Sequence, residues 1–393
     1  MPDIIHIIRF KTALAHWPHF FTQFSTLVSG INSPGFHPNL AHWKDQLDGF
    51  IRTLLAPENS SHQGPGLDLG IIMEMISFLN ENVTCQIIRH AMVTLERSDH
   101  LTPPCPFCWI SMGSDARREQ VVRTDQDNGL IYADPPSGQA AKTDHYFLSL
   151  AQHIVTDLDR FGFQRCSGNV MATNPLWRRP LGEWLKALDQ WVGSTDTQTI
   201  RQLTILLDFR AVYGDMRLAQ VVQSRVFNLF HKHESVSHFL AQDDQVFPSP
   251  KTLFGQLRTQ KGPKGQKRKN QIEYFNLKTR GLVHLINGAR ILALNHRIQS
   301  PSTLARLQLL GEEKVITPEE THLYTAAFTH LVRMKIENHL LGQNKKNLPI
   351  HCIDVSTLDP KAYQKLMVSL DGVIQLQKKI HRTYNQAWMN FFN

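Results

Sequence analysis

At 393 residues the chain is long enough for two or three domains, each with its own hydrophobic core. Hydrophobic residues at 41% and charged residues at 19% indicate an ordered globular protein. The formal net charge of +8 suits phosphate-bearing ligands, yet it is too modest to establish nucleic-acid binding.

The cysteine content and the hydropathy pattern both bear on the compartment. The five cysteines are odd in number and scattered along the chain, which predicts a reducing environment. No stretch approaches the roughly 20 apolar residues of a membrane span. His6 and Arg9 interrupt the apolar N-terminal residues, and no signal-peptide cleavage site follows them. We therefore expect a soluble cytoplasmic protein without a membrane partner.

The N-terminal part of the chain has helical spacing. A helix is expected through residues 40–55. Residues 56–66 are rich in Gly, Pro, Ser and Asn and are interpreted as a linker. Helical spacing returns over residues 67–95. Cys105 and Cys108 have the spacing of a zinc or redox pair, but no second pair exists to complete a four-ligand site. A packed loop before a strand is the preferred interpretation.

The next segment contains the most informative residues. A short apolar run ends in Gly113-Ser114, where a strand would turn into a helix whose N-terminus favours phosphate. Asp125 and Asp127 then lead into another apolar run. Residues two apart on a strand point to the same face, so a strand over 125–131 would place both carboxylates side by side. Such a pair repels itself unless a cation is bound, and carboxylates suit Mg²⁺.

Further candidate residues follow this segment. An amphipathic helix is expected over 147–161. Asn174, Trp177, Arg178 and Arg179 could frame a ligand, although packing of Trp177 and Trp184 in the core is the preferred alternative. The nearly continuous apolar run 203–215 predicts a buried central strand. Asp208 lies inside that run, where an ionised carboxylate is costly unless it is paired or bound to metal.

The C-terminal part combines a basic loop with helices. Residues 261–269 include five basic side chains and no acids, and Phe275-Asn276-Leu277-Lys278 follows directly. Thr317 to Glu320 form a capping box with Pro at the first helical position. Asp359-Pro360 begins the last helix in the same way. For the basic residues 261–269, a solvated loop is the usual role.

Two of these motifs together resemble a known family. Gly113-Ser114-x-x-Arg117-x-Glu119-Gln120, followed by the stretch 124–128 (Thr-Asp-Gln-Asp-Asn), resembles a family of bacterial nucleotidyltransferases. That family is related to the N-terminal domain of PII-uridylyltransferase, within the DNA polymerase beta-like superfamily. The segments around 166–184, 203–215 and 275–278 are similar to later parts of the same family. The resemblance covers roughly residues 67 to 380. The chain departs from the usual pattern at Asp115, Ala116 and Asn276.

The resemblance implies an α+β fold. A small mixed sheet would form the nucleotidyltransferase domain, flanked by a helical N-terminal segment and a C-terminal helical bundle. The corresponding domains are residues 1–100, 101–235 and 250–393. Asp125, Asp127 and Asp208 would ligate two Mg²⁺ ions, with Mn²⁺ as an alternative. Gly113 and Ser114 would cradle the phosphates of a nucleoside triphosphate.

The resemblance also implies roles for two cations and a class of acceptor. Arg117 would neutralise charge on the leaving pyrophosphate, and Lys278 would reach a phosphate or a carboxylate. We expect transfer of a nucleotide to a protein hydroxyl in a signalling role, and not to a nucleic acid. Two alternatives stay open. Asp115, Ala116 and Asn276 would fit a non-catalytic nucleotide sensor, and the basic loop would fit a nucleic-acid-tailing enzyme.

Overall fold

A computed structural model describes residues 2–55, 68–121, 125–233, 235–261, 273–342 and 351–391. The chain forms two compact units, one from Met1–Asp189 with Ile205–Val226 and one from Gln190–Thr204 with Phe227–Asn393. The fold is α+β, as expected, with one small mixed sheet and many helices. No helix in the described ranges is both long and apolar enough to cross a membrane.

A four-stranded sheet is the centre of the first unit. Its strand order is β5-β3-β1-β6, with β1 antiparallel to both β3 and β6 and with β3 parallel to β5. The strands span Phe107–Met112 (β1), Asn128–Tyr132 (β3), Arg178–Pro180 (β5) and Phe209–Gly214 (β6). All residues of β1 and β3 are buried, which explains why both strands are nearly continuous apolar runs.

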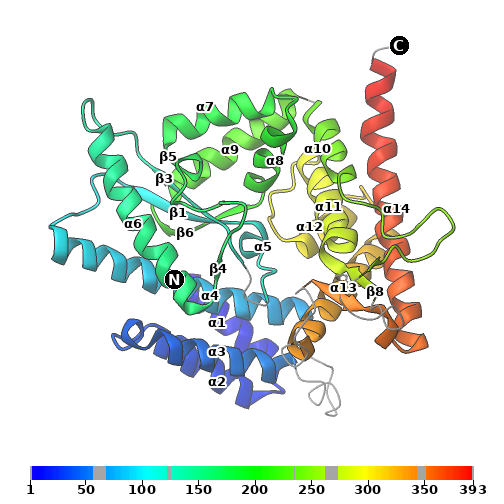
Figure 1. Ribbon diagram of the computed structural model, residues 1–393, viewed down its shortest axis with the longest axis horizontal. Coiled ribbons are helices and arrows are strands. Elements are labelled where there is room, and N and C mark those ends of the chain that lie inside the picture. Colours follow the sequence, from blue (N-terminus) through cyan, green and yellow to red (C-terminus); the bar gives the residue numbers. More distant parts are fainter. Residues whose placement is uncertain are drawn as a thin grey trace. The chain divides into compact units, whose positions relative to one another are not determined.

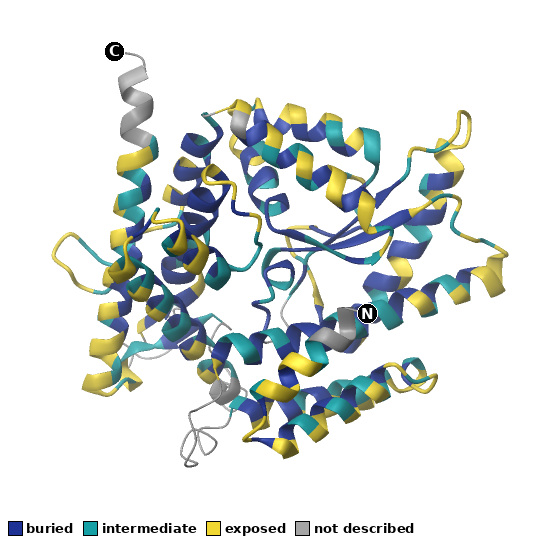
Figure 2. Ribbon diagram, turned by 180° about the vertical axis from the view of Figure 1, so that it is seen from behind, coloured by how far each residue is buried: buried dark blue, intermediate teal, exposed yellow. Residues whose placement is uncertain are grey.

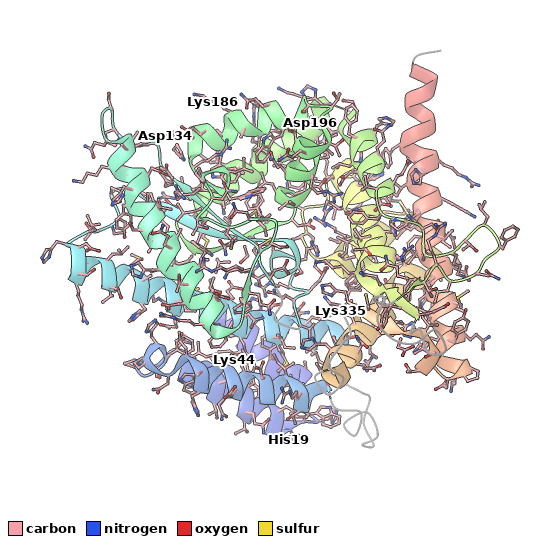
Figure 3. All side chains as sticks on the ribbon, in the orientation of Figure 1. His19, Lys44, Asp134, Lys186, Asp196 and Lys335 are labelled. Atoms are coloured by element: carbon pink, nitrogen blue, oxygen red, sulfur yellow. The ribbon has the colours of Figure 1, made fainter. Side chains whose placement is uncertain are left out.

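Helices cover both faces of this sheet. Figure 1 shows α4 (Leu69–Asp99) and α6 (Ala140–Phe161) on one side and α7 (Leu181–Val192) and α9 (Met216–Lys232) on the other. In Figure 2 the strands between them are buried along most of their length. Asp134, labelled in Figure 3, follows β3, and its Oδ1 accepts a hydrogen bond of 2.9 Å from the Gly182 N–H near the start of α7.

The three N-terminal helices are α1 (Pro2–Ala13), α2 (Pro18–Ile31) and α3 (Leu40–Leu55), the last with the bounds expected from sequence. α1 and α2 pack on α4, whereas α3 packs on α2 and α6. Phe10, Phe24 and Phe78 form an aromatic cluster with ring centroids 5.3 to 5.9 Å apart. Asp68 caps α4 by accepting a hydrogen bond from the Ile71 N–H. The expected linker at 56–66 lies outside the described residues.

Two strand predictions are wrong in their extent. Residues 125–131 form two short strands, β2 (Asp125–Gln126) and β3, which belong to different sheets and are separated at Asp127. The run 203–215 is not a central strand. Its first residues complete α8 (Thr197–Leu206), and β6 is an edge strand of the sheet. A short apolar run fits the buried end of a helix as well as it fits a strand.

The second unit is mostly helical and contains a three-stranded sheet. The helices are α10 (Ser235–Gln245), α11 (Val283–Asn295), α12 (Thr303–Glu312), α13 (Pro318–Gly342) and α14 (Pro360–Phe391). The sheet order is β7-β8-β9, from Gln260–Lys261, Glu273–Asn276 and Cys352–Asp354. The capping box is confirmed, since Thr317 N–H donates to Glu320 Oε2 and Glu320 N–H donates to Thr317 Oγ1.

Candidate active site

Two carboxylates and a thiol meet at the end of the main sheet. One donor atom each from Asp125, Asp127 and Cys166 lies within 4.8 Å of the other two. The parallel pairing of β2 with β4 (Gln164–Arg165) brings them together. Gln126 pairs with Arg165, so the residues that follow, Asp127 and Cys166, lie next to each other. Within the described ranges, no other group of three or more acidic, His or Cys side chains could hold a metal ion.

Gly113 lies directly against this group. Its φ is +61°, a left-handed conformation that favours glycine, and a Cβ at this position would be 2.8 Å from Asp127 Oδ2. The backbone around Gly113 fixes two strands at once. The Met112 N–H donates to the Asp127 carbonyl at 2.9 Å, and the Gly113 N–H donates to the Asp208 carbonyl at 3.0 Å. Any other residue at Gly113 would therefore displace the Asp127 carboxylate.

Asp208 is fully buried, and its carboxylate binds a cation from the protein itself. Arg117 Nη1 donates to Asp208 Oδ2 at 2.8 Å, and Arg117 Nε donates to Glu119 Oε2 at 2.7 Å. Burial opposes the charged form of Arg117, but the two carboxylates raise its pKa above the usual value. The structure therefore places Asp208 with Arg117 and Glu119, outside the group formed by Asp125, Asp127 and Cys166.

Two of the three residues that depart from the family pattern, Asp115 and Ala116, have different surroundings. Ala116 is fully buried, so its methyl group points into the core and away from solvent. Asp115 is half-buried and lines the same small cavity as Asp127. Ser114 is half-buried at the start of the four-residue helix α5 (Gly113–Ala116). Asp115 thus adds negative charge beside the carboxylate pair, whereas Ala116 adds no bulk there.

Asn128 connects the motif that contains Asp125 and Asp127 to the segment 166–184, which also resembles the family. Its Oδ1 accepts a hydrogen bond of 2.8 Å from the Ala172 N–H, and its own N–H donates to the Val170 carbonyl. The loop after β4 is thereby attached to the start of β3. These hydrogen bonds hold the segment that contains Cys166 close to Asp125 and Asp127.

Other residues of the segment 166–184 stabilise the fold. Trp177 and Trp184 are buried with ring centroids 6.3 Å apart, which confirms the core interpretation. Arg178 is buried, and it donates to the Ala172 and Thr173 carbonyls and to Asp144. Asn174 caps a short 3-10 helix by accepting from the Leu176 N–H.

Other candidate residues are placed elsewhere. Cys108 is buried in β1, and Cys105 Sγ contacts the Ala133 carbonyl, so this pair forms part of the packed strand entry. In the second unit, Lys278 is exposed at the start of a π-helical turn, Lys278–Leu282. Asn276 Oδ1 accepts from the N–H groups of Lys278 and Thr279 at 3.0 Å each. An Asp could accept the same two bonds, so the change to Asn preserves this cap. The basic loop after Lys261 lies outside the described residues.

The donor atoms at the site suit a divalent cation. Asp125 and Asp127 offer the carboxylate oxygens that Mg²⁺ and Mn²⁺ prefer. Burial and the adjacent Asp127 carboxylate raise the pKa of the Cys166 thiol to about 11. Without a metal, Cys166 is therefore a neutral neighbour of the carboxylates. Cys166 was not among the predicted site residues, because only the pairing of β2 with β4 brings it to Asp127.

A mixed sheet that ends in Gly-Ser beside a pair of carboxylates is the core arrangement of a nucleotidyltransferase. Comparison with protein families agrees. Residues 59–198 match the family described as "Putative nucleotidyltransferase DUF294", and residues 234–384 match "Putative nucleotidyltransferase substrate binding domain". Together the two matches cover most of the chain, which belongs to this nucleotidyltransferase family. No curated protein matches the chain.

Proposed function

We propose that the protein is a metal-dependent nucleotidyltransferase that moves a nucleoside monophosphate from a nucleoside triphosphate to an acceptor hydroxyl. The observation that carries this proposal is the convergence of Asp125 and Asp127 against Gly113, where no Cβ fits. The family matches support the reaction class. The need for a cation, the use of a nucleoside triphosphate and the acceptor hydroxyl are parts of our proposal.

In this proposal the acceptor oxygen forms a bond to the α-phosphorus while the bond from that phosphorus to the β-phosphate oxygen breaks. Pyrophosphate leaves with the electron pair of the broken bond, and the hydroxyl proton leaves to solvent. A bound divalent cation supplies charge neutralisation and lowers the pKa of the acceptor hydroxyl. Asp125 and Asp127 hold that cation. Ser114 receives the phosphates, because the Gly113 N–H is already engaged by the Asp208 carbonyl.

Asp208 and Arg117 act as a pair in this proposal. Asp208 becomes a third carboxylate for the cation only if Arg117 exchanges it for another partner, since the two groups form a buried ion pair of 2.8 Å. Until that exchange, Arg117 positions Asp208 and the end of β1. Lys278 is the candidate phosphate contact of the second unit, where it is exposed.

The proposed acceptor is a protein hydroxyl, in a cytoplasmic signalling role. The resemblance to the uridylyltransferase branch supports this choice. Charge supports it as well. Five of the eight excess positive charges come from residues 261–269, so the rest of the chain carries only +3. Such a balance gives little attraction for a nucleic-acid backbone outside that loop.

Labelling experiments test the proposal. The protein is incubated with each labelled nucleoside triphosphate, Mg²⁺ and cell extract, and the label is followed onto protein and RNA. We expect label on a protein, and Asp127→Asn should lower the rate at least about 10²-fold, or about 2.7 kcal/mol of barrier. Asp134→Asn is the matched control, because Asp134 contacts Gly182 and lies outside the donor group. Label on RNA would overturn the protein acceptor.

The ion pair at Asp208 favours one other function, a nucleotide sensor without transfer. If Arg117 retains Asp208, the site has two carboxylates and binds a nucleotide without activating an acceptor. Calorimetry separates the two functions. Asp115→Asn removes charge beside Asp127 and should tighten binding of a triphosphate with Mg²⁺ in both cases. Binding of the triphosphate without turnover in any extract would identify the sensor. Absence of binding in both the wild type and Asp115→Asn would refute the transferase and the sensor alike.

A further inference from the structure

A small polar cavity borders Asp127, between the main sheet and the helices α4 and α6. Its volume is about 20 Å³, which is room for about one water molecule. The polar residues that line it include Asn80, Asp115, Gln120, Gln126, Asp127 and Asn128. The cavity therefore connects the carboxylate group with a residue of α4, which no motif of the sequence singles out.

The three amides from the motif strands and loops are satisfied by the protein. Gln126 Nε2 donates to the carbonyls of Val155 and Phe163, both at 3.1 Å. Asn128 Oδ1 accepts from the Ala172 N–H, and Gln120 Nε2 donates to the Asp125 carbonyl at 3.0 Å. These amides hold the loops in place. None of them needs a ligand to complete its hydrogen bonding.

Asn80 differs from them. Its side chain is 2% exposed, and neither Nδ2 nor Oδ1 has a hydrogen-bond partner in the described part of the chain. Buried amides are normally paired, so an amide with both ends unpaired needs an explanation. The neighbouring helical positions Ile76 and Leu79 are apolar and fully buried, while Ser77, one turn before Asn80, is also buried and its hydroxyl likewise has no partner among the described residues. Of these polar side chains only Asn80 lines the cavity that Asp127 lines.

We propose that Asn80 is an outer-sphere ligand of the metal site. Its carboxamide holds a water molecule in the cavity that it shares with the Asp127 carboxylate, and this water binds the cation that Asp127 holds. Mg²⁺ characteristically keeps several of its waters when it binds to protein carboxylates. Groups that hold such waters orient the direct ligands and tune the affinity for the metal. The inference rests on the proposed metal site, and it deepens that proposal.

The dimensions of the cavity favour water over the other candidates. A nucleobase or a ribose does not fit in a space of about 20 Å³. Water also matches the chemistry of the amide, since Nδ2 can donate to its oxygen or Oδ1 can accept one of its protons.

Two measurements on the full-length protein test the inference: Mn²⁺ affinity by electron paramagnetic resonance, and the thermal midpoint in the presence of a chelator. Asn80→Leu should lower Mn²⁺ affinity roughly 10- to 100-fold. The same variant should keep or raise the thermal midpoint without metal, since it removes two unpaired buried atoms. A purely structural amide would give the opposite pattern, with a lower midpoint and unchanged affinity, and that result overturns the inference.

Control variants separate this inference from the proposed function. Thr84→Val is the matched control, because Thr84 lines the same cavity while its hydroxyl is bonded within α4 to the Asn80 carbonyl at 3.0 Å. Its Mn²⁺ affinity should equal that of the wild type. Asn80→Ala provides a smaller substitution with the same expected direction, should the leucine variant fold poorly. Loss of binding in Asp127→Asn together with wild-type binding in both Asn80 variants refutes only the outer-sphere role. Unchanged binding in Asp127→Asn refutes the metal site itself.

Discussion

The buried group formed by Arg117, Glu119 and Asp208 yields the most informative perturbation of the first unit. The three side chains are 9%, 5% and 1% exposed, and the guanidinium is 2.7 and 2.8 Å from the two carboxylates. Replacing Arg117 with Met keeps much of the apolar side chain and removes the charge. Two buried carboxylates then lose their shared cation. The resulting loss in free energy of unfolding is larger than the stabilisation that the intact ion pairs provide.

The expected loss is about 3–5 kcal/mol, the range for breaking a buried ion pair on one side. In a unit of roughly 200 residues this lowers the thermal midpoint by about 6–20 °C. The loss should also depend on pH. Without Arg117, burial raises the pKa of the carboxyl groups above their unfolded values. The folded variant then binds more protons than the unfolded chain, so its destabilisation is larger at about pH 8 than at about pH 5.

Thermal and urea unfolding at both pH values measure this effect. Arg210→Met is the matched control. Arg210 Nη1 is 2.7 Å from Glu81 Oε2, but the side chains are 14% and 24% exposed, and Glu81 keeps a second partner in Arg118 at 3.4 Å. We expect a loss of no more than about 1 kcal/mol there. Equal stability of the Arg117 and Arg210 variants, combined with lost triphosphate affinity only in the former, would show that Arg117 acts on the ligand.

Four further variants test the site and the second unit. Gly113→Ala should cost about 1–2 kcal/mol for the left-handed backbone and should weaken Mn²⁺ binding, because its Cβ displaces Asp127; an unchanged binding isotherm would contradict the tight contact. Cys166→Ser should abolish the sulfur-to-metal absorption of the Co²⁺-loaded protein, and its persistence would exclude the thiol as a ligand. Thr317→Ala should cost about 1 kcal/mol in urea unfolding, and no loss would exclude a stabilising capping box. Burial and nearby cations lower the pKa of His330 to about 4, so stability is lost as pH falls from about 6.5 towards 4. His330→Gln should flatten that pH dependence, and parallel curves would refute it.

Local spacing was sufficient to predict the carboxylate pair. Asp125 and Asp127 lie side by side although the expected strand is broken between them, because their spacing of two residues survives the break. The glycine at the end of β1 was likewise predicted from the turn it forms. These features depend on backbone geometry over a few residues, which sequence patterns describe well.

Partners distant in sequence could not be predicted in this way. Arg117 meets Asp208 across 91 positions, and no local pattern shows that the strand before Arg117 pairs with β6. Cys166 reaches Asp127 only through the two-residue pairing of β2 with β4. No local pattern marked Asn80, because Glu81 and Asn82 directly after it are polar as well. The apolar run 203–215 was ambiguous because helix ends and strands bury the same residue types.

The aromatic cluster of Phe10, Phe24 and Phe78 has a practical consequence for work with isolated domains. Residues 59–198 match the family, yet Phe78 packs against rings that precede residue 59. A protein trimmed to the matched boundary would present that face of α4 to water, next to the helical turn that holds Asn80. Such a fragment is a poor template for ligand screening. Loss of binding in it would report exposed apolar surface and self-association, and would say nothing about the chemistry of the site.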